Sequence, residues 1–489
     1  MVDRDFSSSA GQGRPETFIT SWKLGTANGM VPMPDCSQPS NAVPLPQALR
    51  EAAELKQSEH QMQLEKRGEW RGPIRFGTPF GRALSKPALD PVLPPWPVPS
   101  GPLRCQGSRV SPTTSCEVPV MGAFTTREGV TIDAVAATAR RWLLNPKATL
   151  LLALGLRWEP IFSRLVAHVP VARVEKLRAR ASMLAAVALA LAFNDFLNRK
   201  LANNWVSDTR WDWDHEIVVV TGGSSGLGAS ITQRLLARNA RTRIVVIDFQ
   251  PLRWTPPRGS RLRYYQCDLS DSTALRATCA RIKDEVGHPS VLFNNAGLAR
   301  GYTVMEGRHA DVEVTMKTNL IAPFLLVKEF LPEMVRRDHG HIVNTGSMSS
   351  VVPPPNIVDY AATKAGLTAL HEGLQLELKY SHHAPRVRLT LGVFSYIQTP
   401  IISGTTNQPN FLFPLLDVQS VSERLVDTVY SGLGATIYMP GIMRFITSLK
   451  GGPEWLFRLA RERSVHSDLD FTGRQDVDSK GALRRVHAR

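Results

Sequence analysis

Residues 218–228, which read VVVTGGSSGLG, decide the fold of this chain. A run of β-branched residues ends at closely spaced glycines, and Ile231, Leu235 and Leu236 then follow at helical spacing. This order predicts a strand, a tight turn and a helix. Glycines in such a turn let the backbone approach a pyrophosphate closely and direct the N–H groups of a helix at it. The stretch therefore predicts a dinucleotide site, although its spacing, TGxxxGxG, differs from the commoner GxGxxG, and a glycine-rich turn can also be only a turn.

Downstream of this turn, short apolar runs alternate with helical patterns. We expect strands over residues 217–221, 243–248, 262–267, 291–294, 341–345, 387–393 and 435–439. We expect helices over residues 226–239, 273–286, 314–335, 360–380 and 420–430. Strands separated by helices of this length form right-handed crossovers. The sequence therefore predicts an α/β fold, a doubly wound parallel Rossmann sheet.

Composition divides the 489 residues into four expected regions. Residues 1–120 are predicted to be a disordered extension, because prolines in segments such as 86–99 exclude helix and central sheet. Residues 121–210 should form apolar and basic helices that associate with a membrane. Residues 211–460 should form the catalytic domain, and residues 461–489 a basic flexible tail.

Two apolar runs, 148–156 and 181–193, stand out in the second region. Neither reaches the roughly 18 uncharged residues expected of a spanning helix. Arginines and lysines surround both runs, and this combination suits the surface of an anionic membrane. A shallow hairpin in one leaflet is expected before a single span. The alternative is that these helices are ordinary core, packed on the catalytic domain or on a second subunit in a homodimer.

The net charge of +15 indicates a membrane surface, a nucleic acid or merely a solvated basic face. The sequence resembles no zinc finger, helix-turn-helix or RNP motif, so we expect no nucleic-acid partner. Its five cysteines show no CxxC pairing or nearby histidines, which indicates reduced thiols and no metal site. With no signal-peptide pattern, we expect a membrane-associated protein facing the cytosol, on the endoplasmic reticulum or lipid droplets.

Asp248 follows the last glycine of the turn by about 20 residues, at the end of an expected strand. A carboxylate there accepts hydrogen bonds from the adenosine ribose and repels a 2′-phosphate, which favours NAD over NADP. Arg243 or Arg253 could pair with that 2′-phosphate instead, so NADP stays open as the cofactor. The alternative is a surface acid at a strand end.

Tyr360 and Lys364 are four residues apart, which places them on one face of a helix. A tyrosine normally ionises near pH 10, and a neighbouring ammonium lowers that pKa, giving a general acid–base for an alcohol proton. Ser347 lies just past an expected strand, at the sheet edge where such folds bind ligands. Its hydroxyl would hydrogen-bond the substrate oxygen.

Together these motifs resemble the short-chain dehydrogenase/reductase family, over about residues 210–440. The motifs are residues 221–228, residues 294–297 (NNAG), Asn319, Ser347, and the pair Tyr360 and Lys364. The resemblance implies that Tyr360 is the acid–base, that Lys364 also binds the nicotinamide ribose, that Ser347 orients the substrate and that Asn319 holds a proton-relaying water.

The resemblance also implies a cofactor groove. Its expected residues are Gly222, Ser224, Ser225, Gly226, Leu227, Gly228, Asp248, Asp268, Leu269, Asn295, Gly297, Tyr360, Lys364, Ile397 and Thr399. Asp268 and Leu269 would contact the adenine. One departure is that Phe394 and Ser395 stand where the family usually has Pro-Gly.

The expected activity is hydride transfer between the nicotinamide of NAD, or NADP, and a lipophilic alcohol or carbonyl. The apolar and basic region before the domain resembles that of the membrane-associated retinol and 17β-hydroxysteroid dehydrogenases, which implies a retinoid, steroid or long-chain substrate. Ile401, Ile402 and residues 411–413 are expected in a substrate lid, or packed beneath it. The alternatives are a soluble NADPH-dependent carbonyl reductase and a catalytically silent, nucleotide-binding membrane scaffold.

Overall fold

The computed structural model describes residues 126–158, 170–404 and 408–462, with three short strands beyond them. These strands are β9 (Leu469–Asp470), β10 (Asp476–Val477) and β11 (Leu483–Arg484). The predicted disordered extension, 1–120, lies outside the described residues, as does most of the predicted tail, 461–489.

Seven parallel strands form the central sheet, in the order β3-β2-β1-β4-β5-β6-β8. They are β1 (Ile217–Thr221), β2 (Arg243–Asp248), β3 (Leu262–Gln266), β4 (Val291–Asn294), β5 (Gly340–Thr345), β6 (Val387–Phe394) and β8 (Thr436–Met439). The strand order reverses at β1 and β4, which creates a crevice at their carboxyl ends. The predicted doubly wound sheet is confirmed.

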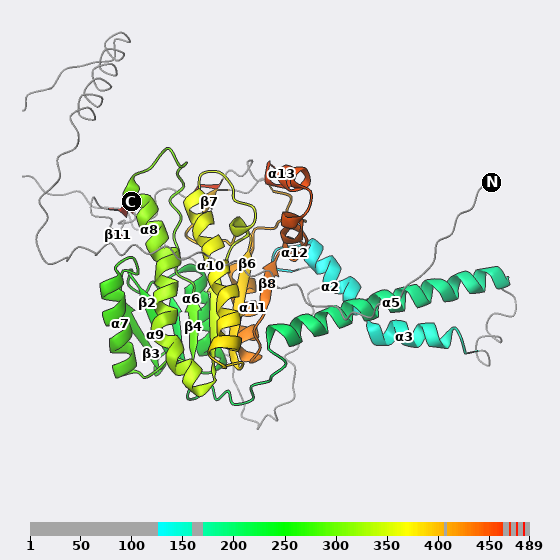
Figure 1. The fold of residues 1–489 in the computed structure, drawn as a ribbon, viewed down its shortest axis with the longest axis horizontal. Coiled ribbons are helices and arrows are strands. Elements are labelled where there is room, and N and C mark those ends of the chain that lie inside the picture. Colours follow the sequence, from blue (N-terminus) through cyan, green and yellow to red (C-terminus); the bar gives the residue numbers. More distant parts are fainter. Residues whose placement is uncertain are drawn as a thin grey trace, which may run out of the picture. The chain divides into compact units, whose positions relative to one another are not determined.

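Helices cover both faces of this sheet (Figure 1). They are α6 (Gly226–Arg238), α7 (Ser272–Glu285), α8 (His309–Met316), α9 (Ala322–Arg337), α10 (Val358–Leu376) and α11 (Val418–Tyr430). In β1, Val218 and Val220 pack into one core cluster and Val219 into the other. This strand is buried on both faces, which explains why it is an unbroken apolar run and does not alternate with polar residues.

The helix predicted over 314–335 differs from the observed one. Helix α8 begins at His309, and a π-helical segment, Lys317–Ile321, separates it from α9. The N–H of Ala322 bonds to the carbonyl of Lys317, five residues earlier. A second π segment, Glu377–Ser381, follows α10, and a 3₁₀ turn, Met348–Ser350, follows β5.

Three helices precede the sheet and form what we call the helical arm: α2 (Ile132–Trp142), α3 (Pro146–Gly155) and α5 (Val171–Ala202) (Figure 1). Helix α3 packs on α5 through Ala153, Ala181 and Ala185. Arg140 of α2 pairs with Asp195 of α5 at 2.8 Å. Helix α5 has 32 residues and contains an 18-residue window of mean hydropathy 1.5. By length and composition alone this helix can cross a membrane, whereas the run 181–193 by itself is too short to do so.

The end of α5 is fastened to the catalytic domain. The side-chain amide of Asn203 bonds to both the N–H and the carbonyl of Gly434, at 2.8 and 3.1 Å. The buried guanidinium of Arg388, on β6, donates to the carbonyls of Asn203, Val206, Pro385 and Gly432.

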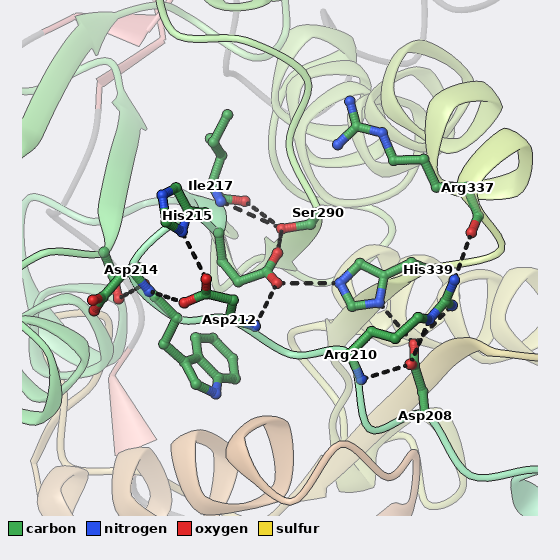
Figure 2. Close-up of polar contacts among 12 residues, drawn as sticks. Asp208, Arg210, Asp212, Asp214, His215, Ile217, Ser290, Arg337 and His339 are labelled. Atoms are coloured by element: carbon green, nitrogen blue, oxygen red, sulfur yellow. Dashed lines mark hydrogen bonds and ion pairs between the residues drawn. The ribbon is translucent and has the colours of Figure 1, made fainter.

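A polar network fixes the linker that follows, at the amino ends of the strands (Figure 2). His339 bonds to Asp208 at 2.7 Å and to Glu216 at 3.2 Å. Burial opposes a charge on His339, but these two carboxylates outweigh it and raise the pKa of the imidazole. The pKa of Asp208 falls to about 2, because hydrogen bonds from Arg210 and His339 outweigh its burial.

Three elements follow β8 at the carboxyl edge of the sheet. They are α12 (Met443–Ser448), a 3₁₀ turn (Leu449–Gly451) and α13 (Glu454–Glu462). Strand β7 (Ser403–Gly404), which follows β6, pairs antiparallel with β9.

Candidate active site

A cavity of about 530 Å³ lies at the carboxyl ends of the central strands. Its wall includes Gly222 after β1, Asp248 at the end of β2, Asn295 after β4 and Thr345 at the end of β5. This is the crevice in which doubly wound sheets bind ligands, and its volume lies within the usual range for small-molecule sites.

The glycine turn forms one wall of the cavity, and its backbone requires glycine. Gly222 and Gly226 have φ angles of +68° and +55°, which side chains rarely adopt. A Cβ at Gly228 would lie 2.2 Å from the carbonyl oxygen of Gly222. Helix α6 begins at Gly226, so its first N–H groups adjoin the cavity. This combination matches a pyrophosphate cradle.

Asp248 lines the cavity and also holds the glycine turn in place. Its carboxylate accepts the N–H groups of Ser224 and Gln250, both at 3.0 Å. Burial raises the pKa of this carboxyl group, and the two hydrogen bonds partly offset that effect. The carboxylate is therefore a fixed acceptor beside the predicted adenosine ribose site.

The two arginines considered as partners for the 2′-phosphate of NADP lie in different positions relative to the cavity. The guanidinium of Arg243 donates to the carbonyls of His215 and Val286, at 2.7 and 3.2 Å. Arg253 lines the cavity, near Asp248 in the wall. Of the two, Arg253 is the one positioned to meet a ligand.

Most of the predicted cofactor residues form part of the cavity wall. These are Gly222, Ser225, Gly226, Leu227, Asp248, Leu269, Asn295, Gly297, Tyr360, Lys364, Ile397 and Thr399. Ser224, Gly228 and Asp268 lie outside the wall and support it. Ser224 bonds to Asp248 and Gln250, Gly228 packs on the turn, and the Asp268 carboxylate accepts from Ser270.

Ser347, Tyr360 and Lys364 converge at the cavity. Ser347 follows β5 and its hydroxyl lies beside that of Tyr360, while α10 carries both Tyr360 and Lys364. The Lys364 ammonium donates to the carbonyl of Thr345 at 2.8 Å and lies 5.4 Å from the centre of the Tyr360 ring. The sequence alone did not identify the Thr345 carbonyl as the group that positions this lysine.

The pKa of Tyr360 shifts in the direction opposite to the one predicted. Burial raises it to about 12, and the hydrogen bond with Ser347 offsets only part of that rise. Burial also lowers the pKa of Lys364 to about 8. Lys364 is buried and Tyr360 is partly buried in the cavity wall, and desolvation of the charged forms exceeds the predicted effect of the ammonium on the phenol.

Asn319 lies in the π segment behind the cavity and is almost fully buried. Its side-chain amide donates to the carbonyl of Leu298 at 2.8 Å and accepts the N–H of the same residue at 2.9 Å. It also donates to the Thr363 hydroxyl at 3.3 Å. The side chain therefore joins the π segment to the chain after β4 and to α10.

Phe394 and Ser395, where the sequence departs from the family pattern, both line the cavity. Phe394 ends β6, and its ring lies so close to Gly392 that a Cβ there would be 2.3 Å away. The N–H of Ser395 bonds to the carbonyl of Met439 at 2.9 Å, which continues the pairing with β8. The sheet thus accommodates the departure.

Apolar side chains also contribute to the cavity wall. They are Met348, Val352, Pro354, Ile357, Ile397, Pro400, Ile401 and Ile402. Two of the expected lid residues, Ile401 and Ile402, are in this group. Phe411 lies outside the wall and is 44% exposed.

Within the described ranges, no group of three histidine, cysteine, aspartate or glutamate side chains could hold a metal ion. Cys267 and Cys279 are buried free thiols, and burial raises the pKa of Cys279 to about 12. The other three cysteines lie outside the described residues.

The family model described as short chain dehydrogenase matches residues 216–409. Dehydrogenase RED2 of Cochliobolus heterostrophus is 37% identical over 209 residues, 42% of this chain and 78% of that protein. The chain belongs to the short-chain dehydrogenase/reductase family. It is therefore an oxidoreductase of that family.

Two further relatives extend this comparison. The short-chain dehydrogenase/reductase described here is 28% identical to epidermal retinol dehydrogenase 2 of Mus musculus over 255 residues, 50% of the chain and 80% of the relative. It is 26% identical to the uncharacterized oxidoreductase TDA5 of Saccharomyces cerevisiae over 328 residues, 66% of the chain and 95% of the relative. A solved short-chain dehydrogenase from Burkholderia cenocepacia, in complex with NADP, has a TM-score of 0.43 and 23% identity, covering 51% of this chain and 99% of that one.

Proposed function

We propose that this chain transfers a hydride between a nicotinamide cofactor and a lipophilic alcohol or carbonyl of the retinoid, steroid or long-chain type. The observation that carries the proposal is the convergence of Ser347, Tyr360 and Lys364 in a cavity whose wall is partly apolar. The similarity to epidermal retinol dehydrogenase 2 supports the same substrate class.

The cavity wall fits a dinucleotide. The glycine turn and the start of α6 would hold the pyrophosphate, Asp248 the adenosine ribose and Lys364 the nicotinamide ribose. When bound, the nicotinamide supplies or accepts the hydride. Asp248 favours NAD, while Arg253 in the same wall provides a cation for the 2′-phosphate of NADP.

Tyr360 exchanges the proton of the substrate hydroxyl. With a pKa near 12 it holds that proton at neutral pH, ready to donate it to a carbonyl oxygen. Ser347, which bonds to the same hydroxyl, orients the substrate oxygen. Asn319, which would hold the proton-relaying water, also bonds through its side chain to Leu298 and Thr363.

We also propose that the helical arm associates with a membrane. Small alanines form the contact between α3 and α5, while larger apolar side chains point outward: Leu151 and Met183 are each 71% exposed and Phe193 is 60% exposed. Helices that pack together in lipid have small residues at their contact and large apolar residues on the surface that faces the lipid. Asp195, in the apolar part of α5, is neutralised by Arg140. The cytosolic face of the endoplasmic reticulum or of lipid droplets would suit such an arm. The competing explanation is a homodimer in which the second subunit covers the same exposed apolar side chains.

The test is turnover of all-trans-retinol, estradiol and 1-decanol, and of the matching carbonyls, each with both cofactors. Tyr360→Phe should lower turnover at least about 100-fold while dinucleotide affinity is kept, because the phenol performs acid–base work. The matched control is Tyr380→Phe, at an exposed tyrosine in the second π segment.

Other results would contradict the proposal. Dinucleotide binding without turnover of any substrate favours the silent scaffold. Turnover of small polar carbonyls alone, with NADPH, favours the soluble reductase. Complete release of the protein from a membrane fraction by carbonate would exclude tight membrane association.

A further inference from the structure

Residues 126–133, which we call the strap, end in the first two residues of α2 and contact the chain at residues 411–423 and at Gly441. The strap is about 300 residues away in sequence from the segments it touches: Glu128 lies 289 residues from Asp417, and Asp133 lies 308 residues from Gly441. Helix α2 continues from the strap, so the strap connects the helical arm to the catalytic domain.

Four contacts fix the strap. The Asp133 carboxylate accepts the N–H of Gly441 with both oxygens, at 2.9 and 2.7 Å. The N–H of Ile132 bonds to the carbonyl of Phe411 at 2.8 Å. Glu128 accepts the N–H of Asp417 at 3.2 Å, and Arg127 pairs with Glu423 at 2.9 Å.

The approach of Asp133 to the backbone is close. A Cβ at position 441 would lie 2.9 Å from the nearer carboxylate oxygen, so a side chain there would displace the carboxylate. Gly441 lies two residues before α12, which begins at Met443. Asp133 therefore fixes the start of the elements that follow β8.

Phe411 and Asp417 belong to the outer half of what we call the substrate loop, residues 396–404 and 408–417. The inner half of this loop includes Ile397, Ile401 and Ile402 of the apolar cavity wall. The two halves are bonded together: the N–H of Leu416 donates to the carbonyl of Tyr396 at 2.8 Å, and the N–H of Gln398 donates to the carbonyl of Leu416 at 2.9 Å.

We propose that the strap is a positioning element for the substrate loop, and that Asp133 is the residue on which this positioning chiefly depends. Asp133 bonds to Gly441, and its neighbour Ile132 bonds to Phe411 in the outer half of the loop. Leu416, at the end of that half, bonds to Tyr396 and Gln398 beside the apolar wall. Loss of the Asp133 contact frees the strap, loosens the loop and weakens binding of the substrate. The last consequence rests on the proposed function; the ordering of the loop does not.

The primary test is hydrogen–deuterium exchange of the full-length protein in detergent micelles. Asp133→Ala should raise exchange of the backbone amides of residues 396–402 and 411–417 about tenfold, as expected for loss of a hydrogen bond to a charged group. Asp133→Asn, which keeps one acceptor oxygen, should restore part of the protection. The matched control is Asp271→Ala, which removes a carboxylate that accepts two backbone N–H groups at the start of α7.

Faster exchange confined to residue 441 and the strap would overturn the proposal. Equal loosening of the substrate loop in Asp271→Ala would also overturn it, because the effect would then follow from lower overall stability. The second readout is kinetic, with 1-decanol as the probe: Asp133→Ala should raise KM for the alcohol about tenfold and leave KM for the dinucleotide unchanged. Absence of turnover in the parent protein would count against the proposed function, while the exchange result would still decide the role of the strap.

Discussion

Replacement of Lys364 by methionine should stabilise the protein while removing its activity. Burial lowers the pKa of this lysine from 10.5 to about 8. Below pH 8 the side chain is charged in both the folded and the unfolded chain, and the folded state bears the cost of burying that charge. A shift of this size corresponds to about 3 kcal/mol of folding free energy.

The net gain is smaller than the pKa shift alone implies. Methionine has a similar shape but cannot donate to the Thr345 carbonyl, and that lost hydrogen bond costs about 1 kcal/mol. Lys364→Met should therefore be about 2 kcal/mol more stable than the parent at pH 7, a rise of about 3 °C in Tm for a chain of this size. The gain should disappear as the pH rises from about 8 to about 10.5, because the folded parent then loses the proton before the unfolded chain does.

The assay is thermal unfolding of parent and variant in the same detergent at pH 7 and pH 10, followed by tryptophan fluorescence. Turnover should fall at least about 100-fold, as for loss of a residue in the acid–base system. Lys317→Met is the matched control, because Lys317 is exposed and pairs with Glu313 on the helix surface. A variant less stable than the parent at pH 7, or a gain of equal size at both pH values, would refute the reasoning.

Three further variants test the cradle, the cofactor preference and the junction with the arm. Gly228→Ala should weaken dinucleotide binding at least about tenfold in a fluorescence titration, since its Cβ would lie 2.2 Å from a backbone carbonyl, whereas Gly373→Ala, with open space around it, should not. The parent should have a higher kcat/KM with NAD than with NADP, and Asp248→Ala should reduce the ratio of these two values about tenfold. Equal values of kcat/KM in the parent would contradict the assignment. Arg388→Met should lower stability by about 3 kcal/mol or more in thermal unfolding, because four buried carbonyls lose their donor, while the exposed Arg386→Met should have little effect.

The sheet could be predicted closely from the sequence because its strands are buried on both faces. The bounds of β1, β2 and β4 agree with the prediction residue for residue. In each case a β-branched or apolar run ends at a glycine, an acid or an asparagine, so the hydrophobic run and the residue that ends it predict the same strand boundary. The π segment at Lys317–Ile321 could not be predicted this way, since one inserted residue leaves the apolar pattern of a helix almost unchanged.

The candidate site was predictable in its residues but not in its electrostatics. Ser347, Tyr360 and Lys364 lie near the carboxyl ends of strands that had to meet at one edge, so their convergence follows from the topology. The pKa of Tyr360 depends on how completely the fold excludes water from the pair, and local spacing carries no information about that. The second role of Asp248, as acceptor for the Ser224 and Gln250 amides, depends in the same way on tertiary structure.

Contacts between distant parts of the chain were beyond prediction from one sequence. Arg388 lies in an expected strand, and only the structure shows that it is buried and donates to carbonyls as far away as Asn203. Asp133 lies in the first turn of α2, and only the structure shows its bond to Gly441. Neither pairing follows a local pattern.

The junction between α5 and the sheet has a consequence for the direction in which the cavity opens. Asn203 and Arg388 bond the end of the helix to Gly434 and to β6, so a force on that end of α5 acts directly on the sheet. If the arm binds a bilayer as proposed, the bilayer would also restrict the direction in which the cavity opens. The route by which a lipophilic substrate enters would then depend on the arm as well as on the cavity wall.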